Sequence, residues 1–207
     1  MNGFEFVKIN NNPFLYGDEN RTVILDNSFM MMKYPVTVSQ YRAFCSITGR
    51  NMPMQPNWGW IDEHPIVNIT WYDANDFAEW LELALPTTEE WELASRGIYG
   101  RLYPWGNEWD CSRCCNSVNG QIKSTIEIGS YPSGVSPYGV HDMAGNVWEW
   151  TCSNNKITED YIVRGGSWFN FHENNFQNTF VNYRSPENFY NNVGIRCILR
   201  LPGISNA

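Results

Sequence analysis

Regular secondary structure is hard to place in the second half of this 207-residue chain, and this limits the possible folds more than any other feature. From residue 98 onward, short apolar pieces such as YPWGNEWD and SPYGVHDMAGNVWEWT are interrupted by Gly, Pro, Asn and Asp. Only YIVRGG and VGIRCILRL have the pattern of strands. Long loops in a compact domain usually carry function, so we expect a fold that tolerates extensive ordered loops.

Helices are predicted only in the first half, where three capping boxes occur. In each, a Thr is followed three residues later by Gln, Asp or Glu: Thr37 with Gln40, Thr70 with Asp73, and Thr87 with Glu90. Gly49 and Gly97 are plausible ends for the first and third helices. We expect the second helix, over WYDANDFAEWLEL, to be the longest.

Composition and charge exclude several classes of protein. A hydrophobic content of 43% over 207 residues supports a sizeable core, and we predict one domain over 1–207. The net charge of −8 argues against nucleic acid as a partner, because affinity for phosphate backbones depends on clustered Lys and Arg. We also expect no membrane-spanning segment, and the first residues lack the pattern of a signal peptide.

The cysteines leave two readings open. Cys111, Cys114 and Cys115 form a CxxCC cluster that could bind zinc, although no second CxxC or His pair accompanies it. The alternative is a group of free or oxidisable thiols in a loop.

The segment 169–192 has the composition of a contact surface. It contains eight Asn and seven aromatic residues but no Lys, and few aliphatic side chains. Rigid rings supply contact area at low entropic cost, and short amides supply adaptable hydrogen bonds. The chain therefore has the features of a receptor more than those of an enzyme.

Ordered motifs along the chain resemble the formylglycine-generating enzyme (sulfatase-modifying factor) family. They are KYPVTVSQYRAF, HPIVNITWYDANDFAEWL, LPTTEEWELASRG, YPWGNEWD, YGVHDMAGNVWEW, VRGGSW and VGIRC. The resemblance implies an α+β, C-type lectin-like fold, with two or more helices packed on a small twisted antiparallel sheet and most of the chain in structured loops.

The catalytic branch of that family oxidises a substrate cysteine with two cysteines that follow its RGGS motif and a bound copper. The matching positions here are Asn170 and Asn175, and an amide cannot replace a thiolate as a copper ligand or redox centre. We expect Cys152 and Cys197, the nearest thiols, to be small buried residues. A copper-dependent oxidoreductase with a rearranged thiol pair remains the alternative.

From RGGSW to VGIRC the chain resembles the variable region of the target proteins of diversity-generating retroelements. Adenine mutagenesis of Asn codons would scatter them into a restricted set of residues. Changes in the first two bases of an Asn codon of the AAY type can produce a restricted set of residues, and positions that carry such a residue are called reachable. They are Phe169, Phe171, His172, Phe176, Thr179, Phe180, Tyr183, Phe189 and Tyr190. Trp168, Glu173, Gln177 and Glu187 are not reachable, and we assign them to the scaffold or to other codons.

The resemblance makes residues 164–197 the variable ligand-binding region. We predict as contact residues Phe169, Asn170, Phe171, His172, Asn174, Asn175, Phe176, Asn178, Phe180, Asn182, Tyr183, Asn188, Phe189, Tyr190 and Asn191. Some rings could instead point into the core, and Phe180 and Val181 are the first candidates for partial burial. We assign Trp168 to the scaffold, because Trp is commonly well buried.

We expect that no cofactor is required, although relatives of this fold often place a structural calcium at the GNVWEW motif. Asn146, Glu149 and the Val147 carbonyl offer hard oxygen ligands in the GNVWEW motif. The alternative is a side-chain network that braces the loop, in which Arg164 and Arg196 pair with buried carboxylates such as Glu149.

We therefore expect a non-catalytic, diversified ligand-binding protein that acts as a monomer. Its ligand would be a protein or glycan of variable identity, outside the cell if an export or lipidation signal has been removed. A third reading is a structural accessory domain whose Asn-rich face stays solvated.

Overall fold

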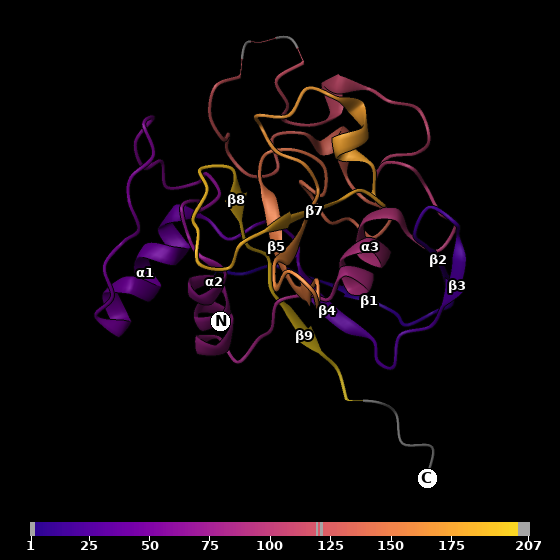
Figure 1. The fold of residues 1–207 in the computed structure, drawn as a ribbon, viewed down its shortest axis with the longest axis horizontal. Coiled ribbons are helices and arrows are strands. Elements are labelled where there is room, and N and C mark those ends of the chain that lie inside the picture. The colour runs from indigo at the N-terminus through magenta and orange to yellow at the C-terminus, as the bar shows by residue number, and fades with distance from the viewer. Residues whose placement is uncertain (1–2, 119, 121, 203–207) are drawn as a thin grey trace.

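The computed structural model describes residues 3–118, 120 and 122–202, so the outer limits of the predicted 1–207 domain lie outside the described residues. Within these residues the chain forms nine strands and three α-helices, which are joined by long loops (Figure 1). The strands are β1 Phe6–Ile9, β2 Phe14–Tyr16, β3 Arg21–Val23, β4 Phe29–Met32, β5 Trp148–Asn154, β6 Tyr161–Arg164, β7 Val181–Arg184, β8 Val193–Gly194 and β9 Ile198–Arg200. The helices are α1 Val38–Thr48, α2 Trp71–Trp80 and α3 Thr88–Arg96.

All three predicted helices are confirmed, and each begins with the predicted capping box. In each box the Thr hydroxyl accepts from the N3 backbone N–H, and the N3 side chain accepts from the backbone N–H of the Thr. The predicted order of lengths was wrong, because α1 has 11 residues and α2 has 10. Helix α2 ends before the predicted limit because Glu82 takes the left-handed conformation, with φ of 58°.

Three sheets carry the strands, in the orders β1-β4-β9, β2-β3 and β7-β6-β5-β8. All strand pairs are antiparallel except β5 with β8, which is parallel. Among the strands, β6, β8 and β9 lie where YIVRGG and VGIRCILRL predict them. Strand β5 was missed because its first four residues are all buried, so the alternation that marks a half-exposed strand is absent.

Two layers of packing flank the four-stranded sheet. Helices α1 and α2 lie on one side of it in Figure 1, where Phe44 and Phe77 share a core with Trp148, Trp150 and other buried residues. Helix α3 lies on the other side and packs with β1, β4 and β9 in a second core. The α+β class is thereby confirmed.

Ordered loop fills the chain between α3 and β5, as the sequence predicts. Its described residues contain two short 3-10 helices, η1 Cys111–Arg113 and η2 Pro132–Gly134, and no strand. The loops pack closely enough to require glycine, because a Cβ on Gly145 would lie 2.2 Å from the Cys115 carbonyl oxygen. Together with 165–180, these loops form the upper part of the molecule in Figure 1.

Candidate ligand-binding face

Residues 164–197, which the sequence predicts to be the variable region, begin at a buried anchor, the RGGS turn that follows β6. The Arg164 guanidinium donates to Glu92 at 2.6 Å and to the carbonyl oxygens of Asn178 and Thr179, so it ties the start of the segment to its middle. Gly166 has a φ of 76°, and a Cβ there would lie 2.7 Å from the Phe176 ring. Both ends of residues 164–179 are therefore fixed to the scaffold.

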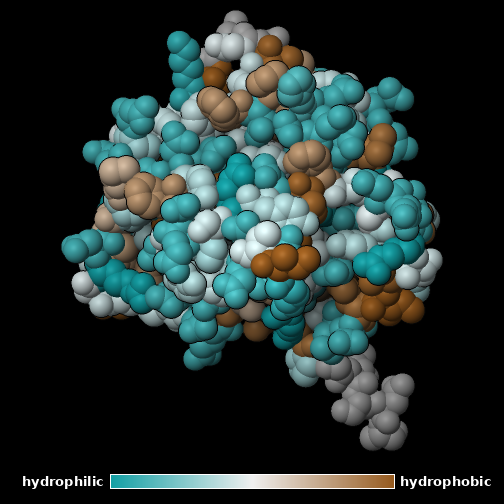
Figure 2. Space-filling view, viewed as in Figure 1, coloured by the Kyte–Doolittle hydropathy of each residue, from teal (hydrophilic) through white to brown (hydrophobic). Residues whose placement is uncertain are grey.

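Four aromatic rings of the segment face solvent, as the contact-surface reading requires. Phe169 and Phe171 are 60% and 59% exposed, and Tyr183 and Phe189 are 43% and 48% exposed. The polar residues His172, Asn174, Asn188 and Asn191 are exposed as well. These eight residues are called the exposed set below. On the side of the molecule in view, Figure 2 shows apolar groups as separate patches among hydrophilic ones.

Two predicted contact residues are buried, and for them the prediction was wrong. Phe176 is 1% exposed, because the 3-10 helix η3 (Glu173–Phe176) turns its ring inward against Trp109 at 5.0 Å. Asn178 accepts from the Ser95 hydroxyl at 2.5 Å and donates to the Arg101 carbonyl oxygen at 3.0 Å. A fully buried ring and a buried amide whose hydrogen bonds are satisfied cannot contact a ligand, so both residues belong to the scaffold.

The other five predicted contact residues, Asn170, Asn175, Phe180, Asn182 and Tyr190, are half-buried. Partial burial was predicted for Phe180 and Val181 and is confirmed for both. Asn182 accepts from the Arg184 guanidinium at 2.9 Å, and the same guanidinium lies over the Tyr190 ring at 5.2 Å. These residues can contribute an edge to a contact, but their main partners are in the protein.

Asn170 and Asn175, at the positions of the oxidase cysteines, form a local amide network. The Asn170 carboxamide donates to the Asn175 side-chain oxygen at 3.3 Å and accepts from both the hydroxyl and the backbone N–H of Ser167, at 2.7 and 3.0 Å. The pair therefore shapes the loop and offers no thiolate to a metal.

The sequence reading missed Trp58, which extends the face beyond the variable region. Its ring meets Trp168 edge-on at 5.3 Å, and the Trp168 indole N–H donates to the Asn191 carbonyl oxygen at 3.2 Å. Trp168 is itself buried, which confirms its scaffold role, while Met54 in the same loop as Trp58 is exposed. The signal was the run MPMQPNWGW, which has the loop composition of a contact segment.

The two side chains proposed to hold calcium, those of Asn146 and Glu149, do not fit that ion. Both Glu149 oxygens accept from the Arg196 guanidinium, and one also accepts from the Trp91 indole N–H at 2.7 Å. The Asn146 carboxamide exchanges two hydrogen bonds with the backbone of Ile126. A carboxylate neutralised by a buried guanidinium is a poor ligand for a cation that needs six to eight oxygens. The bracing network is the arrangement present.

Buried ion pairs hold the loops. Arg196 has the predicted partner, whereas Arg164 pairs with a carboxylate that the sequence did not indicate. Arg196 pairs with Glu149 as predicted, at 2.8 Å and without exposure of either side chain. Arg164 pairs with Glu92, which also binds Arg96 at 2.8 Å. Such a network is costly to disrupt because removal of one partner leaves a buried charge uncompensated.

The CxxCC cluster has the environment of structural thiols. Cys114 and Cys115 are buried, and burial raises the pKa of the Cys114 thiol to about 12, so it stays protonated near neutral pH. Within the described part of the chain no disulfide and no group of three metal-ligating side chains occurs. Cys197 is buried as predicted, whereas Cys152 is exposed, because the outer residues of β5 leave the core.

Comparisons with known proteins assign the family. Residues 3–201 match the Sulfatase-modifying factor enzyme 1-like domain, so the chain belongs to that family, as the motifs predict. Inactive C-alpha-formylglycine-generating enzyme 2 of Bos taurus is 34% identical over 151 residues, covering 65% of this chain and 50% of the relative. The chain spans about half the length of the curated relatives that it matches first.

Solved structures confirm the fold. PvdO from Pseudomonas aeruginosa is similar with a TM-score of 0.80 at 20% identity, covering 95% of this chain and 94% of that one. Treponema denticola variable protein 1 is similar with a TM-score of 0.76 at 18% identity, covering 96% and 95%. The C-type lectin-like fold that the sequence resemblance implies is thereby confirmed. No helix among the described residues is long and apolar enough to span a membrane.

Proposed function

We propose that the protein is a non-catalytic receptor whose segment 164–197 is diversified by retroelement mutagenesis to bind protein or glycan surfaces. The observation that carries the proposal is the division within this one segment. Arg164, Phe176 and Asn178 are buried and hold the backbone, whereas the exposed set points outward from it. Side chains in such a set can change without disturbing the packing beneath them.

Exposure of the four rings supports binding on energetic grounds. Burying a Phe side chain fully is favourable by roughly 1.5–3 kcal/mol. Because the four rings are 43–60% exposed, each retains about half of that driving force for contact with a partner. Aromatic anchors beside short amides are the composition of antibody-type contact surfaces. Four exposed rings within one segment favour the receptor over a structural accessory domain whose Asn-rich face stays solvated.

The amide network of Asn170 and Asn175 is the observation against the oxidoreductase alternative. One relative carries the word inactive in its name, which supports the proposal that a chain of this family can lack catalysis. The likeness to a protein named variable protein 1 supports the diversified reading. We further propose that the receptor acts as a monomer at the cell surface or in another compartment outside the cytoplasm.

A display library tests whether the face is built for diversification. The eight positions of the exposed set are randomised to the residues reachable from AAY codons, and the library is selected against immobilised hen lysozyme as a model protein. We expect folded binders whose changes are spread over the exposed set. A matched library that randomises Arg164, Phe176, Asn178 and Arg196 should yield few folded members.

Two results would contradict the proposal. The first is equal loss of folded protein in the two libraries, because the exposed set would then be part of the core. The second is selection of no binder from a well-folded exposed library of about 10⁸ members or more, since nanomolar to micromolar contact surfaces are the expected product of such a face.

A further inference from the structure

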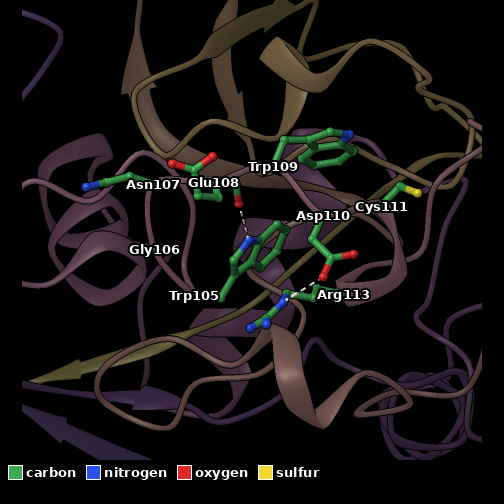
Figure 3. Close-up of a pocket in the computed structure, with 8 residues that line it drawn as sticks. All are labelled: Trp105, Gly106, Asn107, Glu108, Trp109, Asp110, Cys111 and Arg113. Atoms are coloured by element: carbon green, nitrogen blue, oxygen red, sulfur yellow. Dashed lines mark hydrogen bonds and ion pairs between the residues drawn. The ribbon is translucent and has the colours of Figure 1, made fainter.

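The YPWGNEWD motif forms a hollow that the proposed function does not use. It has a volume of about 560 Å³ and is lined by a loop that runs from Trp105 to Arg113 (Figure 3). The hollow is open and lies outside the variable region. Its residues combine two indoles with acidic, amide and guanidinium groups.

The aromatic part of the hollow is fixed in place before any ligand arrives. Trp105 stacks on Tyr103 at 5.4 Å with an angle of 8° between the rings, and its indole N–H donates to the Glu108 carbonyl oxygen at 2.9 Å. Trp109 stacks on Phe176 at 5.0 Å, and the two indoles lie 6.0 Å apart. Each indole thus has one face covered by a buried ring and stays partly exposed.

The polar part of the hollow is also ordered. The Arg113 guanidinium donates to Asp110 at 3.0 Å and to the Ser133 carbonyl oxygen at 3.1 Å, while the second Asp110 oxygen accepts from the Ser112 hydroxyl and backbone N–H. These contacts lower the pKa of Asp110, so the carboxylate stays charged. Asn107 and Glu108 are exposed at the rim.

We propose that this hollow is a binding site for neutral carbohydrate. A sugar ring presents an apolar face of C–H groups, which packs on an indole, and an edge of hydroxyls, which bond to a carboxylate and a guanidinium at once. An open, mixed surface suits such a ligand better than an apolar molecule, which needs an enclosing pocket. Glu108, Asp110 and Arg113 sum to −1, and the chain to −8, so acidic sugars are disfavoured.

The hollow stays the same when the residues of the neighbouring exposed set vary. The variable region supports the hollow from behind, because Phe176 lies under Trp109 and the Asn178 backbone N–H donates to the Leu102 carbonyl oxygen at 2.7 Å. Both of these residues are buried and are excluded from the exposed set. The hollow can therefore bind the same sugar whatever the exposed set carries, and the proposal does not depend on diversification.

Titration with defined sugars tests the proposal. The probes are the methyl glycosides of glucose, galactose and mannose, N-acetylglucosamine and maltotetraose, followed by tryptophan fluorescence and by saturation-transfer NMR. We expect saturable binding of at least one probe with a Kd on the order of 0.1–10 mM, as is usual for a single shallow site. Absence of saturation by all five probes overturns the proposal.

Variants locate the site. Trp105→Ala should weaken binding at least about tenfold. Arg113→Ala, which removes the guanidinium and leaves the aromatic stack intact, should weaken it several-fold. Ile157→Ala is the matched control, because Ile157 is 91% exposed in the β5–β6 turn, and it should leave binding unchanged. Wild-type affinity in a folded Arg113→Ala protein, or loss of binding on changing Phe169 and Phe171 to Ala, would place the sugar elsewhere and contradict the proposal.

Discussion

The substitution Phe176→Ala tests whether this residue of segment 164–197 belongs to the scaffold or to the contact surface. The ring is 1% exposed, stacks on Trp109 and fills the space above Gly166, so Phe176→Ala removes a fully buried side chain and leaves a cavity. Phe→Ala changes of this kind cost about 3–5 kcal/mol. For a chain of 150–250 residues, this corresponds to a fall in melting temperature on the order of 10 °C.

Phe171→Ala is the matched control, since it removes the same ring from a position that is 59% exposed. We expect a change in the free energy of unfolding within about 0.5 kcal/mol, as for other surface substitutions. Urea unfolding, followed by tryptophan fluorescence and by circular dichroism, gives both values. Equal destabilisation by the two substitutions, or a neutral Phe176→Ala, would refute the division into buried anchors and an exposed set.

Three further predictions concern single sites. Burial raises the pKa of Asp142 to about 6, so its ionised form is disfavoured in the folded state, and stability should fall by up to about 3 kcal/mol as pH rises from about 4 to 6. Asp142→Asn should flatten that part of a urea-midpoint curve; an unchanged curve would refute the assignment. Glu92→Gln leaves two buried arginines without a counter-charge and should cost about 3–5 kcal/mol, whereas exposed Glu19→Gln should be neutral in the same assay. The wild-type protein should not oxidise a cysteine-containing sulfatase-type peptide in the presence of copper, whereas a double change of Asn170 and Asn175 to Cys should increase Cu(I) uptake over wild type; peptide turnover by the wild type would revive the oxidoreductase.

Local rules predicted the helices well. A Thr with Gln, Asp or Glu three residues later satisfies orphan backbone groups by itself, so the start of α1, α2 and α3 follows from neighbouring residues alone. The strands β1 to β4 contain only three or four residues each, which is too short for an alternating pattern to stand out. The arrangement of the helices and strands in the fold was predicted from the resemblance to a family, because composition alone did not indicate it.

The sequence could not show which side chains of the site point to solvent and which point into the core. Codon chemistry treats Phe171 and Phe176 alike, but the η3 turn leaves one ring outside and turns the other inward. Asn178 has the same composition signal as Asn188, yet its amide bonds to Ser95 and to the Arg101 carbonyl oxygen. These partners are more than 70 residues away in the chain, so no local pattern could reveal them.

The most direct test of the diversified receptor is the encoding DNA. The genome around the gene is searched for a near-copy of the segment that encodes residues 164–196, and every mismatch between the two copies is recorded. The account predicts mismatches almost only at template adenines, concentrated in the codons of the exposed set and absent from those of the buried residues Phe176 and Asn178. Absence of any near-copy, or mismatches spread evenly over bases and codons, would contradict diversification and leave a ligand-binding protein of fixed specificity.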